Sequence, residues 1–159
     1  MSWFERASTL AILLALTGCG FQLARPAPLP NFVESLNLQA EDTRSDLYLA
    51  LEREFLQRGI PLQADSGNRL VINSVQSGQR ILSVSARNIP REYEVFYTVN
   101  YQFFRDEELL IDRPSDTLTR DYVWNEFEVL GKVREEEQVR EVIVQDLVDS
   151  IMRQLSSLQ

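Results

Sequence analysis

Strict alternation of apolar and polar residues marks one stretch of the chain as a β-strand. Between residues 93 and 104 every odd position is apolar or aromatic, namely Tyr93, Val95, Tyr97, Val99, Tyr101 and Phe103. A period of two places these side chains on one face of a sheet, so the pattern predicts a strand with one buried face. The charged run from 105 to 108 predicts a tight turn directly after it.

Three further stretches predict strands. Residues 70–85 predict one that precedes the alternating strand, with Gly78 as a bulge or twist point. Residues 109–124 predict the last strand, where Pro114 favours an edge position or a bulge because proline cannot donate a hydrogen bond to a strand ladder. The half-apolar residues 32–38 predict a short first strand.

The first helix is predicted over residues 44–58. Thr43 and Asp46 form a box-like pair typical of a helix N-cap. Gly59 is expected to end the helix, and Ile60 could pack back on it in a Schellman-type contact. Apolar residues recur at helical spacing inside these limits, at Leu47, Leu51 and Phe55.

A second, longer helix is predicted over residues 132–156. Its first turn contains Glu135, Glu136 and Glu137, whose carboxylates complement the positive end of the helix dipole. One apolar stripe runs along it, formed by Val139, Val142, Ile143, Leu147, Ile151 and Leu155.

The element order is therefore β-α-β-β-β-α. Each helix has one apolar stripe and the alternating strand has one apolar face, which two helices on one face of a four-stranded sheet would satisfy. We expect an α+β two-layer sandwich with a mostly antiparallel sheet, in which a right-handed crossover joins the first two strands. Residues 31–159 then form a single domain, and the partly aromatic outer face of the sheet could be an interaction surface.

The composition excludes several kinds of chemistry. The chain has no histidine, one cysteine and one lysine, so histidine-based metal sites, catalytic pairs with histidine and internal disulfides are impossible. The net charge of −8 would repel nucleic acid, and any anionic partner would need a local basic patch. We expect no metal and no nucleic-acid partner.

The single cysteine lies at the end of an apolar N-terminal stretch. Residues 7–16 are too short to span a bilayer but have the length of a signal-peptide apolar region. The sequence that follows, Leu16-Thr17-Gly18-Cys19, resembles a bacterial lipobox. This resemblance implies that residues 1–18 are a signal peptide, and that Cys19 carries S-diacylglycerol and an N-acyl chain. The alternative is a buried or stray cysteine after a short helix.

Residues 19–30 would form a lipidated tether. Gly20, directly after the cysteine, points by the same resemblance to the outer membrane and its periplasmic side. The tether contains Pro26, Pro28 and Pro30, which favour an extended polyproline conformation. The sequence leaves open whether this segment is a spacer or an irregular segment packed along the domain.

An acid-free window is the most unusual feature of the charge pattern. From residue 66 to residue 91 there is no Asp or Glu, while Arg69, Arg80, Arg87 and Arg91 fall within it. Arg87 and Arg91 flank a predicted turn, where an arginine pair could bind phosphate or carboxylate groups. The alternative is a solvated turn that balances the acids just after it. Lys132, at the start of the second helix, is either compensated by nearby glutamates or free to contact a ligand.

Several segments in a fixed order resemble those of one known family. They are Gly18-Cys19-Gly20-Phe21-Gln22-Leu23, Glu52-Arg53-Glu54-Phe55-Leu56-Gln57-Arg58-Gly59-Ile60, Arg87-Asn88, Glu92-Tyr93, Thr98-Val99-Asn100-Tyr101, and Lys132 followed by Glu135, Glu136, Glu137 and Gln138. With these segments the chain resembles the lipopolysaccharide-assembly lipoproteins of the LptE family, also called rare lipoprotein B, over nearly all of residues 18–155. It departs at Ala24, where many relatives continue with arginine.

The resemblance implies a non-catalytic protein with the β-α-β-β-β-α fold. Such a protein would plug the lumen of the outer-membrane barrel LptD as a heterodimer and help to deliver lipopolysaccharide to the outer leaflet. It would bind lipopolysaccharide directly, with Arg87 and Lys132 matching basic positions of the family and Arg91 and Arg80 as further candidates. An accessory lipoprotein of a phospholipid-trafficking transporter is the alternative. A carboxylate-dependent hydrolase is disfavoured, because the sequence shows no recognisable pair of acidic residues.

Overall fold

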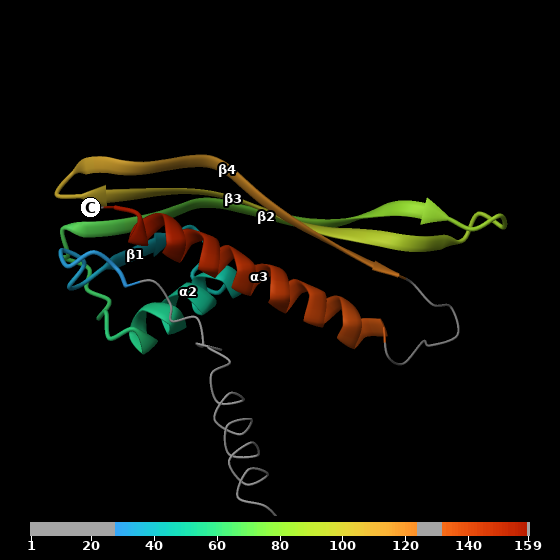
Figure 1. Cartoon of the computed structure of the whole chain (residues 1–159), viewed down its shortest axis with the longest axis horizontal. Coiled ribbons are helices and arrows are strands. Elements are labelled where there is room, and N and C mark those ends of the chain that lie inside the picture. The colour runs from blue at the N-terminus through green and yellow to red at the C-terminus, as the bar shows by residue number, and fades with distance from the viewer. Residues whose placement is uncertain (1–27, 124–131, 159) are drawn as a thin grey trace, which may run out of the picture.

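Two helices cover one face of a four-stranded sheet (Figure 1). The computed structural model describes residues 28–123 and 132–158, with the backbone alone for 132–136. The strand order is β1-β2-β3-β4, with β1 parallel to β2 and the other pairs antiparallel, so the predicted α+β class and element order are confirmed. The elements are β1 (Asn37–Ala40), α2 (Asp46–Gln57), β2 (Asn68–Val84), β3 (Pro90–Arg105), β4 (Glu108–Val123) and α3 (Lys132–Ser156).

The first strand lies further along the chain than predicted. The sequence predicted residues 32–38, whereas β1 begins at Asn37. The preceding apolar residues Val33 and Leu36 are buried, but in a loop that enters the core. Leu36 exchanges backbone hydrogen bonds with the segment after α2 instead, and Asn68 fixes the loop by donating its side-chain amide to the Phe32 carbonyl at 3.0 Å. Residues 37 and 38 do belong to β1 and Leu36 forms an isolated β-bridge with Leu62, so the prediction is wrong only for residues 32–35, where the pattern marked burial.

The caps of α2 confirm one prediction and correct another. Ser45, rather than Thr43, is the N-cap, because its hydroxyl accepts a hydrogen bond from the Tyr48 amide at 3.3 Å. At the other end Gly59 has φ +77°, and the Ile60 amide donates to the Phe55 carbonyl at 2.9 Å. This is the predicted Schellman arrangement, which requires a residue that readily adopts positive φ.

The β3–β4 hairpin closes through a two-residue turn, as the charged run predicted. Asp106 and Glu107 both have positive φ, at 46° and 69°, which is the geometry that suits the twist of paired strands. Further along β4, Pro114 lies in a bulge, since the register passes from Val99↔Asp116 to Tyr101↔Arg113. The sequence predicted a bulge or an edge position there, and β4 is also the edge strand.

Gly78 is not a bulge. It pairs in register with Phe96 of β3, and the bulges of β2 lie on either side, between Ile72 and Ser74 and between Ile81 and Ser83. A Cβ atom at Gly78 would stand 2.7 Å from the Phe96 ring. The glycine therefore provides room for an aromatic ring of the neighbouring strand.

The core fills only part of the length of the sheet. Beyond Val95, towards the β2–β3 turn, buried side chains give way to exposed ones, with Tyr122 as an exception. We call this outer part, residues 80–94 and 121–123, the arm; its turn extends past the first turn of α3 (Figure 1). The core itself is formed by Leu47, Leu51 and Phe55 of α2, by Ile143, Leu147, Ile151 and Leu155 of α3, and by Leu70, Val95, Val99, Tyr101 and Phe103 of the sheet.

The end of the predicted tether contacts the domain. Leu29 is partly buried against the core, and the Pro30 carbonyl accepts a hydrogen bond from the Val33 amide at 3.0 Å. Residues 19–27 of the tether, the signal peptide and Cys19 lie outside the described residues. The described helices include none that is long and apolar enough to cross a membrane.

Candidate functional site

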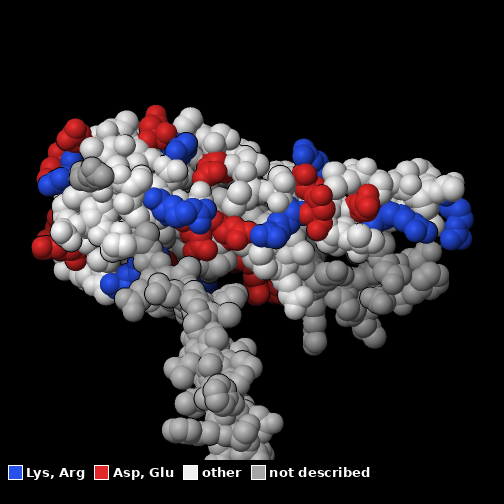
Figure 2. All heavy atoms as spheres, viewed as in Figure 1, with Lys and Arg blue, Asp and Glu red and all other residues white. Residues whose placement is uncertain are grey.

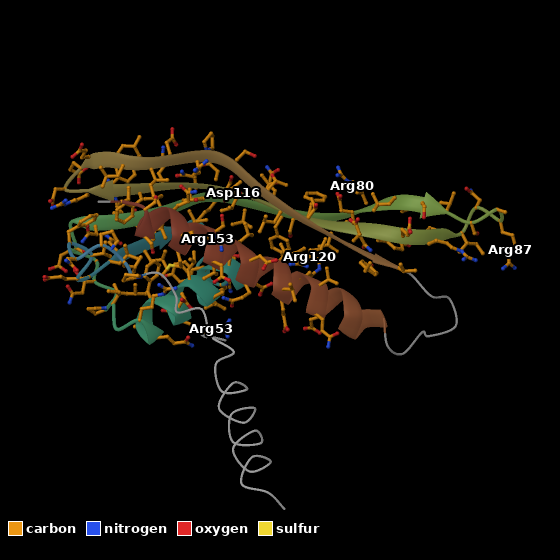
Figure 3. The ribbon with its side chains drawn as sticks, in the orientation of Figure 1. Arg53, Arg80, Arg87, Asp116, Arg120 and Arg153 are labelled. Carbon is orange, nitrogen blue, oxygen red and sulfur yellow. The ribbon has the colours of Figure 1, made fainter. Side chains whose placement is uncertain are left out.

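Arg87 lies at the outermost point of the molecule, on the β2–β3 turn (Figure 3). Backbone hydrogen bonds order this turn: the Ser85 amide donates to the Ile89 carbonyl at 2.7 Å, and the Asn88 amide donates to the Ser85 carbonyl at 2.8 Å. Asn88 takes the positive φ of 60° that such a turn requires, a value that asparagine tolerates well. The guanidinium is thus carried by a folded turn that terminates two long strands.

Exposed apolar side chains accompany the arginine. Ile81, Leu82 and Val84 of β2 and Val123 of β4 are between 45% and 64% exposed, in a part of the sheet where strands β2, β3 and β4 lie side by side. By register, Val84 and Val123 lie on the face of Pro90 and Glu92, whereas Ile81 lies on the face of Tyr93. Exposed apolar side chains grouped at one end of a sheet commonly mark a site of interaction with a protein or a lipid. The exposure of these side chains could not be predicted from the sequence, because strand periodicity shows which side chains share a face but not where the covering helices end.

An aromatic pair stiffens the arm from the helix side. Tyr93 and Tyr122 pair across β3 and β4 with their rings stacked at 5.5 Å, and Gln79 donates its amide to the Tyr122 hydroxyl. Stacked cross-strand aromatics stabilise a sheet beyond the contribution of their buried area. The exposed patch therefore rests on an ordered framework.

The other predicted basic residues occupy different positions. Arg91 is exposed at the start of β3, close to the turn, whereas Arg80 lies further from the tip and forms an ion pair with Glu94 at 2.5 Å. Lys132 begins α3, and its side chain lies outside the described residues. Arg69, from the same acid-free window, is at the opposite end of β2, where its guanidinium lies over the Phe104 ring.

The outer end of the arm is consequently basic. Figure 2 shows Lys and Arg atoms at its outermost part, while Asp and Glu atoms lie further back towards the body of the protein. Phosphate or carboxylate groups would meet arginine side chains there, beside apolar ones. The arrangement suits an amphipathic anion.

A separate group of polar residues joins α3 to β4. Arg120 contacts Asp146 at 2.5 Å, Ser150 donates to Asp116 at 3.2 Å, and Arg113 donates to Gln154 at 2.8 Å. These contacts place α3 along one edge of the sheet, and Figure 3 shows Asp116 and Arg120 on that side. They are polar links between two elements and not a binding site.

Tyr101 is buried beneath these links. Its hydroxyl has no hydrogen-bond partner among the described residues. The pKa of Tyr101 is raised to about 12, chiefly by burial and in part by the charge of Asp116, while Arg113 acts in the opposite direction. The described residues also contain no cluster of acidic or cysteine side chains that could hold a metal ion.

A four-stranded sheet covered on one face by two helices is the fold of a class of small bacterial lipoproteins. The solution structure of an uncharacterized lipoprotein B from Nitrosomonas europaea has a TM-score of 0.72 at 26% identity, over 87% of this chain and 91% of that one. The crystal structure of rare lipoprotein B from Shewanella oneidensis gives 0.69 at 18% identity, over 77% and 94%. A minor lipoprotein from Acinetobacter baumannii gives 0.65 at 21% identity, over 82% and 94%.

The sequence places the chain within that class. The model of the LptE family, described as lipopolysaccharide-assembly, matches residues 33–155, and the chain belongs to this family. The resemblance stated from the sequence is therefore confirmed. The family is one of non-catalytic lipoproteins of the outer membrane that act in lipopolysaccharide assembly. A search of curated protein sequences gave no match.

Proposed function

We propose that this lipoprotein binds lipopolysaccharide directly through the end of its arm. The observation that carries the proposal is the meeting of Arg87 and Arg91 with the exposed side chains of Leu82, Val84 and Val123 on one ordered structure. Lipopolysaccharide combines phosphate groups with acyl chains. Guanidinium groups pair well with phosphate, and apolar side chains favour contact with acyl chains over contact with water.

The four basic residues would take unequal parts in this binding. Arg87 and Arg91 would contact phosphates directly, and Lys132 would join them from the start of α3. Arg80 would contribute less, because Glu94 already neutralises part of its charge. The protein would thereby hold lipopolysaccharide during transfer without catalysing a reaction.

We further propose that the protein is anchored by lipids on Cys19 to the periplasmic side of the outer membrane, and that it assembles and plugs the LptD β-barrel as a heterodimer. Membership of a lipopolysaccharide-assembly family supports this role. The same finding favours it over an accessory role in phospholipid trafficking. Depletion of the protein should leave LptD misassembled, and membranes should yield the two proteins together. Normal LptD folding after depletion would contradict the assembly role.

The binding site can be tested with charge reversals. The double variant Arg87→Asp and Lys132→Asp should bind lipopolysaccharide at least about tenfold more weakly, since two charge-assisted contacts are lost. Association with LptD should persist, as measured by co-purification. Arg44→Asp is the matched control, because Arg44 has a 95% exposed side chain near the start of α2, far from the arm. Equal binding by the double variant and the wild type would show that lipopolysaccharide binds elsewhere.

A further inference from the structure

One edge of the sheet is open over much of its length. β1 pairs with β2 only from Arg69 to Ile72, yet β2 continues to Val84 (Figure 1). In the described ranges no other strand lies beside residues 73–84 on the side away from β3. Backbone N–H and C=O groups that point to this side therefore lack strand partners, which is the arrangement to which an additional strand can bind.

The opposite edge of the sheet, formed by β4, is protected against pairing with an additional strand. Along β4, the Pro114 bulge interrupts the edge and the polar contacts of Arg120 and Asp116 hold α3 against the strand. On β2, the two bulges enclose an unbroken register from Ser74↔Asn100 to Ile81↔Tyr93. The single charged residue within this run, Arg80, is paired across the sheet with Glu94 and leaves the edge accessible.

A hollow of about 500 Å³ adjoins the start of this open edge. It lies where the chain leaves β1 and turns towards α2, and its walls include Ile72, Val75 and Tyr97 from the sheet and Leu47 from α2. A strand that continued the line of β1 along β2 would pass over this hollow. The lining also includes charged and hydroxyl side chains, among them Arg44, Asp46 and Ser77, so a side chain of the added strand would lie against Val75 and its apolar neighbours with polar groups around it.

The charge distribution along the edge predicts where acidic residues of the added strand would lie. No Asp or Glu occurs from Ser66 to Arg91, and Arg80 and Arg87 lie towards the tip (Figure 3). Around the hollow the charged residues are Glu41, Asp42 and Asp46 against the single Arg44, so this end of the edge is net acidic. A partner strand should therefore carry acidic residues near the arm tip and none near the hollow.

We propose that residues 74–81 of β2 bind an extended segment of another protein as a fifth strand of the sheet. Its main chain would pair with the open edge, an apolar side chain would fill the hollow beside Val75, and acidic residues would lie near Arg80. This inference goes beyond lipopolysaccharide binding, because the ligand is a polypeptide and the surface is the edge of β2 rather than the end of the arm.

The test uses the full mature lipoprotein in detergent and a fluorescent synthetic peptide of about nine residues, the length of a typical strand. One half of the peptide alternates valine with glutamate, the other half contains no glutamate, and both chain directions are made. One of the two should bind. Hydrogen exchange should then slow at residues 73–84 and stay unchanged along β4.

Two altered peptides separate strand addition from other binding. Methylation of alternate backbone amides removes main-chain donors but keeps every side chain, and it should weaken binding at least about tenfold if main-chain pairing carries the affinity. Lysine in place of glutamate should weaken it as well, because lysine would repel Arg80, the one charged residue of segment 74–81. Binding that survives both changes would overturn the proposal.

Variants of the protein locate the site. Ser77→Glu places an acid on the exposed edge beside the hollow and should weaken binding, whereas Thr119→Glu, an exposed position on β4, should not. Equal effects of the two variants would refute the assignment.

Slow exchange at 73–84 that grows with protein concentration in the absence of peptide would identify a second copy as the occupant. Protection of this edge by lipopolysaccharide alone would assign it to the lipid. Either result overturns this proposal, whereas a failure of the peptide to bind leaves lipopolysaccharide binding by the arm unaffected.

Discussion

The ring of Phe96 occupies the space that a side chain at Gly78 would need. The two residues pair directly across β2 and β3, and the nearest ring atom is 2.7 Å from the position of a Cβ at residue 78. This close approach explains a glycine in the middle of a long strand, where glycine is otherwise unfavourable.

Gly78→Val should lower the free energy of unfolding by about 1 kcal/mol or more, because the Phe96 ring must leave its site. In a Phe96→Ala background the same substitution should be neutral or stabilising, since valine favours strands and nothing obstructs it. Urea unfolding of the four proteins measures the coupling between the two positions. An identical effect of Gly78→Val in both backgrounds would show that the ring is not the constraint.

Ser45→Ala should destabilise the protein by about 1 kcal/mol, the usual effect of losing an N-cap hydroxyl. The Ser45 side chain accepts the Tyr48 amide, and alanine leaves that donor without its partner. Thr43→Ala is the matched control, because Thr43 is exposed and lies outside the helix, and it should change stability by less than about 0.5 kcal/mol. Thermal unfolding compares the two. A larger effect at Thr43 would indicate that Thr43 is the N-cap, as predicted from the sequence.

The phenol of Tyr101 should remain protonated when exposed tyrosines ionise. Its folded-state pKa of about 12 lies above the ordinary value of 10.0, so folding favours the protonated form. This contribution to stability is complete below pH 10 and is lost as the pH rises towards 12, with a slope of up to about 1.4 kcal/mol per pH unit.

Tyr101→Phe should flatten that alkaline loss of stability. It should change stability at neutral pH little, because the hydroxyl has no described hydrogen-bond partner to lose. Ultraviolet absorbance titration follows phenolate formation, and urea unfolding at several pH values follows stability. If the variant and the wild type lose stability equally between pH 10 and 12, other groups dominate the alkaline behaviour.

Leu82→Ser combined with Val84→Ser should weaken binding of lipopolysaccharide while the melting temperature stays almost unchanged. Both side chains are about half exposed at the end of the arm, so their loss removes contacts to acyl chains and little of the core. Leu56→Ser serves as the control, because Leu56 is 55% exposed on α2, away from the arm. A similar loss of binding in the control would indicate a general effect of surface polarity.

The sequence determined the fold class well because the strongest elements follow a single period. Residues 93–104 alternate without a break, and the predicted limits of the second helix, 132–156, agree with those of α3. The errors arose where burial and secondary structure separate. Val33 and Leu36 are buried in a loop, and Ser45 caps a helix that was predicted to begin earlier.

The candidate site was predictable only in part. The acid-free window located Arg87 and its turn, but it also included Arg69, which lies at the other end of β2. Which of these arginines share a region depends on strand length and register. The exposed apolar residues beside Arg87 could not be anticipated, because exposure there depends on where the helices stop along the sheet.

Each of the three long strands has one half covered by helices and one half that projects. The covered half determines the stability of the domain, and the projecting half determines how far the arm reaches. A pair of residues added to each strand near the β2–β3 turn would lengthen the arm by about 6–7 Å and would leave the packing beneath the helices untouched. The distance that the arm spans can therefore diverge between relatives much faster than the stability of the domain, and insertions should concentrate at residues 85–89.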